Sequence, residues 1–232
     1  MQTGIYLNAF ICFLIFGFSL FAAVFIYRSN KNSHVDISYA SFWFFTSFTW
    51  LFFSMSLLTF KLGYIDYSMV LNQYLVQTTV FLQGVGISYF SFFRLTKNKT
   101  IASWSVPIFI VLAIAGLYFN YQDGTVYLSK STYYSMEYAI SSTSFIIFQI
   151  MFSLVVITIG LDFLRNLYFW FRKNISFEQK YFFAALAVLI DSMIGYFEQS
   201  STSTTWISML FRLAIILAAH TAYLAYSDKE IL

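Results

Sequence analysis

Seven apolar runs, each about as long as a membrane-spanning helix, divide almost the whole chain between them. A bilayer core of roughly 30 Å needs about 20 mostly apolar residues per helical span. The runs are apolar on every side, as in FICFLIFGFSLFAAVFIY, whereas a transmembrane β-strand would alternate over about 10 residues. The seven runs cover residues 5–27, 38–60, 69–93, 101–119, 138–163, 180–198 and 205–226. The sequence therefore predicts an all-α, polytopic membrane protein with seven transmembrane helices.

The composition agrees with this class. Of the 232 residues, 59% are hydrophobic and 10% are charged, whereas about a quarter of the residues in soluble domains are charged. We expect one domain over residues 1–232, and we expect a lipid bilayer, not nucleic acid, to account for the net charge of +3. Cys12 is the only cysteine, so an intrachain disulfide and a cysteine metal cluster are excluded.

The basic residues are distributed unevenly between alternate loops. The first, third and fifth loops and the tail together hold ten Lys and Arg residues, and the other loops hold two, Lys61 and Lys130. Short loops rich in Lys and Arg stay in the cytoplasm. The asymmetry therefore predicts an amino terminus outside, a carboxyl terminus in the cytoplasm and a location in the inner membrane.

Two charges lie inside the last two apolar runs, Asp191 and Arg212. Asp191 lies seven residues before Glu198, and Arg212 lies six residues after Trp206. At about 1.5 Å per residue, each charge is about 10 Å below the outer surface. Because the linker between the two runs is short, the two helices should be antiparallel neighbours. We therefore predict that Asp191 and Arg212 form a charge-assisted contact, either as a structural clamp or as part of a binding site.

Further polar residues are predicted at a similar depth. They include Gln73 and Gln77 in the third run and Gln149 in the fifth, while Glu198 is expected at the outer surface. Such amides also occur as hydrogen-bonding links between membrane helices. Their common depth favours a polar pocket that opens outward. The predicted ligand-binding residues are Asp191, Arg212, Gln73, Gln77, Glu198 and Gln149.

Several chemistries lack the residues they require. The last run, ISMLFRLAIILAAHTAYLAY, contains no lysine for covalent retinal, and the chain has neither an HExxH nor a G-x-S-x-G motif. We expect no enzymatic activity, no cofactor and no metal. Transporters often contain helices broken by Gly or Pro, but Pro107 is the only proline, and Gln83-Gly84-Val85-Gly86 is the one candidate break.

The pattern from about Ala22 to Leu186 resembles the seven-helix amino-terminal sensor module of bacterial histidine kinases and related signalling proteins. The matching features are the basic loop YRSNKN, Trp50 in the second span, the ending FFRLT of the third span, Pro107 early in the fourth, and a basic loop with Gln179 before the sixth. This chain has Lys97 after Thr96, where the family often has Gly. The family usually continues into a kinase or cyclase domain, and these 232 residues hold none.

The resemblance implies a stand-alone sensor or receptor-like module, which binds a small-molecule ligand and passes its state to a separate membrane or cytoplasmic signalling protein. A small-solute transporter and a structural subunit of a membrane complex are the alternatives that the sequence leaves open.

Overall fold

The computed structural model describes residues 3–122, 128–131, 136–138, 141–172, 178–199 and 206–227. Within these ranges, the side chains of residues 3, 128–138, 196–199 and 206–209 are not described. The helices are α1 (Thr3–Ser29), α2 (His34–Lys61), α3 (Ile65–Val70), the π-helix η1 (Leu71–Val76), α4 (Gln77–Thr96), α5 (Lys99–Gln122), α6 (Ser142–Phe171), α7 (Gln179–Gln199) and α8 (Trp206–Ser227). Two short antiparallel strands, β1 (Leu128–Ser131) and β2 (Met136–Tyr138), are the described elements that are not helical.

The helical membrane class predicted from the sequence is confirmed. Five of the described helices are long and apolar enough to cross a membrane: α1, α2, α5, α6 and α8. Because α3, η1 and α4 follow one another without a break, the described helices form seven rods. The remaining two rods, α3–η1–α4 and α7, contain several buried polar residues, including Gln77, Arg94 and Asp191.

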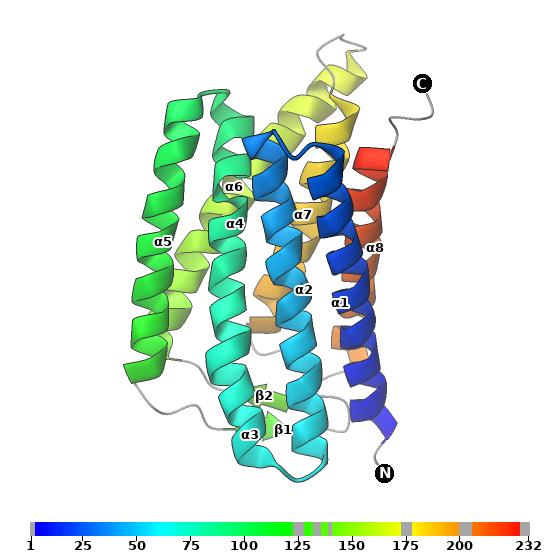
Figure 1. Cartoon of the computed structure of the whole chain (residues 1–232), viewed down its shortest axis with the longest axis vertical. Coiled ribbons are helices and arrows are strands. Elements are labelled where there is room, and N and C mark those ends of the chain that lie inside the picture. Colours follow the sequence, from blue (N-terminus) through cyan, green and yellow to red (C-terminus); the bar gives the residue numbers. More distant parts are fainter. Residues whose placement is uncertain are drawn as a thin grey trace.

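Six of the rods form a closed ring, and α5 packs outside it. Around the ring, α1 contacts α2, α2 contacts α4, α4 contacts α6, α6 contacts α7, α7 contacts α8, and α8 returns to α1. Helix α5 packs against α4 and α6 (Figure 1). Successive rods run in opposite directions, so that α1 begins and α8 ends at opposite ends of the bundle (Figure 1).

Close helix packing in the ring depends on small side chains. A Cβ atom on Gly86 of α4 would lie 3.0 Å from the backbone nitrogen of Phe42 in α2, so glycine is needed for this approach. Ser38 of α2 fastens the same contact, because its hydroxyl donates to the carbonyl of Gly86 at 2.5 Å and accepts from the backbone N–H of Phe90 at 3.0 Å. The first half of α2 is thereby held against α4.

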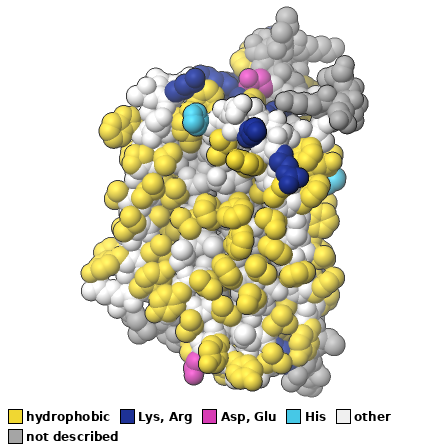
Figure 2. Space-filling model, viewed as in Figure 1, with side chains coloured by type: hydrophobic (Ala, Val, Ile, Leu, Met, Phe, Trp, Pro, Cys, Tyr) yellow, Lys and Arg dark blue, Asp and Glu magenta, His cyan; other side chains and the backbone are white. Residues whose placement is uncertain are grey.

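The surface has a hydrophobic middle and a basic end. Large hydrophobic side chains such as Phe21, Val111 and Leu217 are exposed around the bundle, as expected for a lipid-facing surface. On the face shown in Figure 2, Lys and Arg gather mainly near one end and hydrophobic side chains cover the middle. We call the end of the bundle with the Lys and Arg side chains the basic end. Helices α1, α4, α6 and α8 end there, and α2, α5 and α7 begin there. We call the other end of the bundle the opposite end.

Two helices end beyond the runs predicted from the sequence. The fifth run was expected to end at residue 163, but α6 continues to Phe171. The third run was expected to end at residue 93, but α4 reaches Thr96. Arg94 and Arg165 lie outside the predicted runs, whereas the structure places them inside α4 and α6. Both helices therefore continue beyond the apolar runs, through segments whose charged side chains contact one another.

Candidate functional site

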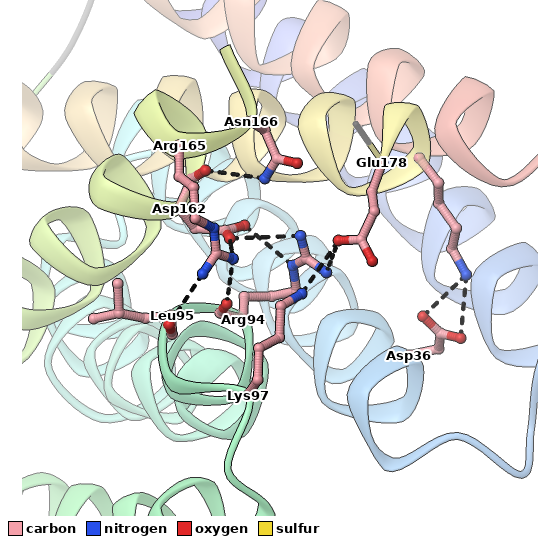
Figure 3. Close-up of polar contacts among 9 residues, drawn as sticks. Asp36, Arg94, Leu95, Lys97, Asp162, Arg165, Asn166 and Glu178 are labelled. Carbon is pink, nitrogen blue, oxygen red and sulfur yellow. Dashed lines mark hydrogen bonds and ion pairs between the residues drawn. The ribbon is translucent and has the colours of Figure 1, made fainter. Parts of the chain in front are cut away.

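The basic end contains a buried ion pair between α4 and α6. The Nε atom of Arg94 lies 3.1 Å from Oδ2 of Asp162, and its Nη2 atom lies 3.5 Å from Oδ1 (Figure 3). The exposed fractions of the two side chains are 2% and 1%. The two contacts use both oxygens of one carboxylate, which is the strong geometry for a guanidinium partner.

Arg165 connects this pair to the end of α4. Its Nη2 atom donates to the carbonyl of Arg94 at 2.7 Å, its Nη1 atom donates to the carbonyl of Leu95 at 3.2 Å, and Nη2 also contacts Asp162 (Figure 3). The last carbonyls of a helix have no partner within it. Arg165 therefore caps α4 while it neutralises Asp162.

Glu178, the residue just before α7, is the last member of this cluster. One of its carboxylate oxygens, Oε2, lies 2.5 Å from Nη1 of Arg94 and 3.2 Å from Nζ of Lys97. Burial by itself raises the pKa of Glu178, but Arg94 and Lys97 together hold the pKa below its ordinary value. The side chain is 44% exposed, so this member of the cluster reaches solvent.

Lys97 has an unusual backbone conformation. Its φ angle is +57°, in the left-handed region at the end of α4. This conformation favours glycine. Burial, and then the neighbouring Arg94, lower the pKa of Lys97, while Glu178 acts in the other direction.

A second cluster at the basic end surrounds Asp36 in the first turn of α2. This carboxylate is fully buried and lies 3.2 Å from Nζ of Lys180 in α7. It also accepts hydrogen bonds from Tyr226 of α8 at 2.5 Å and from the side-chain amide of Asn30 at 2.7 Å. Nζ of Lys180 lies 3.9 Å from the centre of the Tyr226 ring. Asp36 therefore ties together the ends of α2, α7 and α8.

The structure buries Arg212 completely in α8. Its Nη1 atom donates to Oδ1 of Asn8 in α1 at 2.5 Å. Its guanidinium carbon lies 5.5 Å from the ring centre of Trp50 and 4.9 Å from that of Phe53, both in α2. Asp191 is also buried, in the neighbouring helix α7. The expected packing of α7 on α8 is confirmed, and the contact between Asp191 and Arg212 stays a prediction.

The predicted amides lie on other helix interfaces. Gln73 lies in η1, where its Nε2 atom donates to the carbonyl of Asn120 in α5 at 3.3 Å, and Nδ2 of Asn120 donates to the carbonyl of Gln73 at 3.1 Å. Gln77 is buried at the start of α4. Gln73 thus links η1 to α5, which packs outside the ring, while Arg212 contacts α1 and α2 of the ring.

The other two predicted site residues are less defined. Gln149 lies in α6 and is half-buried. Glu198 lies near the end of α7, and its side chain is outside the described part of the chain. The connection between α5 and α6 contains β1 and β2.

Sequence reasoning missed both clusters at the basic end, because it counted their charges only as indicators of orientation. One signal was present. Asp162 and Arg165 are three residues apart, so they share a helix face if the helix continues past residue 163. Arg94 is the last charged residue of another rod that ends at the same side of the bundle.

Within the described residues, no group of three or more His, Cys, Asp or Glu side chains is placed to hold a metal ion. Comparison with family models, with curated proteins and with solved structures finds no match to this chain.

Proposed function

We propose that this chain crosses the inner membrane seven times, with the amino terminus outside and the basic end in the cytoplasm, and that it acts as a stand-alone sensor. In this proposal it binds a small ligand from the outer side and passes its state to a separate signalling protein at the cytoplasmic side. The proposal accords with the resemblance to the sensor modules of bacterial histidine kinases.

The burial of Arg212 carries the proposal. An arginine inside the membrane costs about 2.5–3.5 kcal/mol on insertion scales, and such residues usually serve a function. Asn8, Trp50 and Phe53 hold the guanidinium at a fixed place where α1, α2 and α8 meet. A preorganised guanidinium flanked by aromatic rings is a suitable binding group for a small organic anion.

The ligand contacts centre on Arg212 and Asp191 in this proposal. Gln77, Gln149 and Glu198 stay candidates for its outer wall. Gln73 contributes less directly, since its amide is engaged with Asn120 of α5.

The same helices offer a route to the basic end. Helix α2 carries Trp50 beside Arg212 and Asp36 at its other end, and α8 carries Arg212 and Tyr226. A ligand that shifts α8 against α2 would therefore act on the Asp36 cluster as well. A signalling partner that contacts the basic end would detect this shift.

Thermal unfolding of the purified protein in lipid nanodiscs tests the ligand site. The probes are a panel of small organic anions, with matched small amines as the comparison set. A ligand at 100 times its Kd should stabilise the wild type by about 2.7 kcal/mol. The same probe should fail to stabilise Arg212→Gln, while Arg28→Gln, which changes the same residue type at the basic end, should respond like the wild type. Equal stabilisation of all three proteins would refute a site at Arg212.

The orientation has its own test. In a Cys12→Ser background, a cysteine at exposed Asp66 should react with an impermeant thiol reagent added outside, and a cysteine at exposed Lys99 should not. The reverse labelling pattern would place the basic end outside and remove the outward-facing site.

A transporter is the second candidate, and η1 is the observation that favours it. π-helical turns occur frequently at functional sites, and transporters often interrupt helices near their substrate. Uptake of a stabilising probe into proteoliposomes would favour transport, whereas binding without uptake would favour the sensor.

A further inference from the structure

The guanidinium of Arg94 is held so that one nitrogen faces the surface. Its Nε and Nη2 atoms contact Asp162, and its carbon lies 4.0 Å from the centre of the Tyr181 ring. The remaining nitrogen, Nη1, contacts Glu178, which is partly exposed. Glu178 therefore covers the single outward-facing part of an otherwise immobilised arginine (Figure 3).

The charges in this cluster do not balance. Arg94, Arg165 and Lys97 contribute three positive charges, and Asp162 and Glu178 contribute two negative charges. If Glu178 moves away, three positive charges face one negative charge. A phosphate monoester carries about −1.5 to −2 at pH 7, so it neutralises the open cluster more fully than a single carboxylate does.

The backbone of Lys97 gives a second observation. A non-glycine residue in the left-handed region costs roughly 1–2 kcal/mol, and such conformations cluster at ligand-binding sites. Here the strained residue places its amine 3.2 Å from the same carboxylate oxygen that contacts Arg94. Arg94 and Lys97 thus converge on one anionic atom.

We propose that Arg94 and Lys97 form a phosphate-binding site, which Glu178 occupies in this structure and vacates when a phosphate group binds. Helix α6, which carries Asp162, ends with the exposed Tyr168, Trp170 and Phe171, and aromatic residues of this kind mark the membrane–water interface. The phosphate can belong to a lipid headgroup or be free in solution. The site is independent of the ligand proposed at Arg212.

Binding of phosphatidic acid and of inorganic phosphate to the full-length protein tests this inference. The protein is held in phosphatidylcholine nanodiscs, phosphatidic acid is added at increasing fractions, and inorganic phosphate is titrated separately. Because Glu178→Gln removes the competing charge, this variant should bind at least one of the two probes about tenfold more tightly than the wild type. Asp66→Asn makes the same change in charge at the opposite end and should leave the affinity unchanged.

A second pair of variants separates the site from general attraction to a basic surface. In the Glu178→Gln background, Lys97→Gln should lose the tenfold gain. Lys99→Gln, two residues away and also exposed, should keep it. Equal affinities of the wild type and Glu178→Gln would overturn the site, as would equal losses in the two lysine variants.

The titrations with phosphatidic acid and with inorganic phosphate also identify the source of the phosphate. Saturation by inorganic phosphate, with competition against phosphatidic acid, assigns the site to free phosphate. Binding of phosphatidic acid alone assigns it to a lipid headgroup. If neither probe binds Glu178→Gln, the inference is wrong. A melting temperature for each variant shows whether lost binding reflects lost folding.

Discussion

The two halves of the bundle hold their helices together with different chemistry. At the basic end, the contacts between helices are ion pairs: Arg94 with Asp162, and Asp36 with Lys180. Towards the opposite end they are mainly neutral, as in the amide exchange between Gln73 and Asn120 and the hydroxyl contacts between Ser56 and Ser68. This half also contains two buried charged residues, Asp191 and Arg212, and Arg212 donates to the neutral Asn8.

The two halves offset the cost of buried polar groups in different ways. At the basic end, the buried Arg94 and Asp162 neutralise each other, and Glu178 and Lys97 keep part of their hydration at 44% exposure each. Towards the opposite end, neutral amides and hydroxyls avoid the cost of burying a charge. A charge that is nevertheless buried in that half, such as Arg212, is therefore the better indicator of function.

The largest effect is expected at the buried pair of the basic end. Asp162→Asn leaves the guanidinium of Arg94 buried with one fewer negative charge, so we expect a loss of about 3–5 kcal/mol, as for breaking other buried ion pairs. The measurement is reversible unfolding in mixed micelles. Asp66→Asn, at an exposed position of the opposite end, should cost less than about 0.5 kcal/mol. A small loss for Asp162→Asn would show that the pair is well hydrated.

The next largest effect concerns Arg212 and Asp191. If they contact each other, either single change to Leu leaves one charge without its partner and should cost about 2.5–3.5 kcal/mol, and the double change should recover much of this loss. Additive losses in the same unfolding assay would show that the two residues do not interact. A double variant that is stable but insensitive to the anion panel would support a binding role beyond a structural clamp.

Much of the fold was predictable, because span length and hydrophobicity are local properties. The seven runs match the seven rods to within a few residues at most ends, and the basic loops do lie together at one end of the bundle. The largest difference is the end of α6, eight residues beyond the fifth run, where hydropathy falls but the helix continues and its Arg165 caps α4. A hydropathy window does not register a contact between residues 70 positions apart.

The candidate site was less predictable, because it also depends on contacts between residues far apart in the sequence. Asp191 and Arg212 are both buried, and their depth below the outer membrane surface stays a prediction. The partners of Arg212 in α1 and α2 depend on which rods are neighbours around the ring, and helix spacing alone does not determine that order. Gln73 lies in η1 and donates to the backbone of Asn120 in α5.

A smaller effect is expected from the neutral contacts near the opposite end. Gln73→Leu and Asn120→Leu should each cost about 0.6–1.7 kcal/mol, the range for hydrogen bonds between membrane helices. Each amide donates to the backbone carbonyl of the other residue, so either bond survives the loss of the other side chain. The double variant should therefore show additive losses, in contrast to the coupling expected for Asp191 and Arg212. Strong coupling would indicate that the two amides contact each other directly.

The contribution of Glu178 should depend on pH. Its pKa is below the ordinary 4.5, so its contribution is fully present above pH 4.5 and is lost as the pH falls through the lower value of the folded state. The exposed carboxylate limits the effect to about 1 kcal/mol. The stability difference between the wild type and Glu178→Gln should shrink towards zero below this range. A difference that stays constant from pH 6 to pH 3 would contradict the role of the charge.

The smallest effect separates the two roles of Lys97. Lys97→Gly and Lys97→Ala both remove the amine that contacts Glu178, but only glycine adopts a φ of +57° without strain. The glycine variant should therefore be more stable than the alanine variant by about 1 kcal/mol, and close to the wild type because the lost exposed ion pair is worth about 0–1 kcal/mol. If the amine serves phosphate binding, both variants should lose that binding equally in the Glu178→Gln background. A glycine variant that gains stability but loses phosphate would show that this position gives up backbone stability in order to keep a charge where an anion binds.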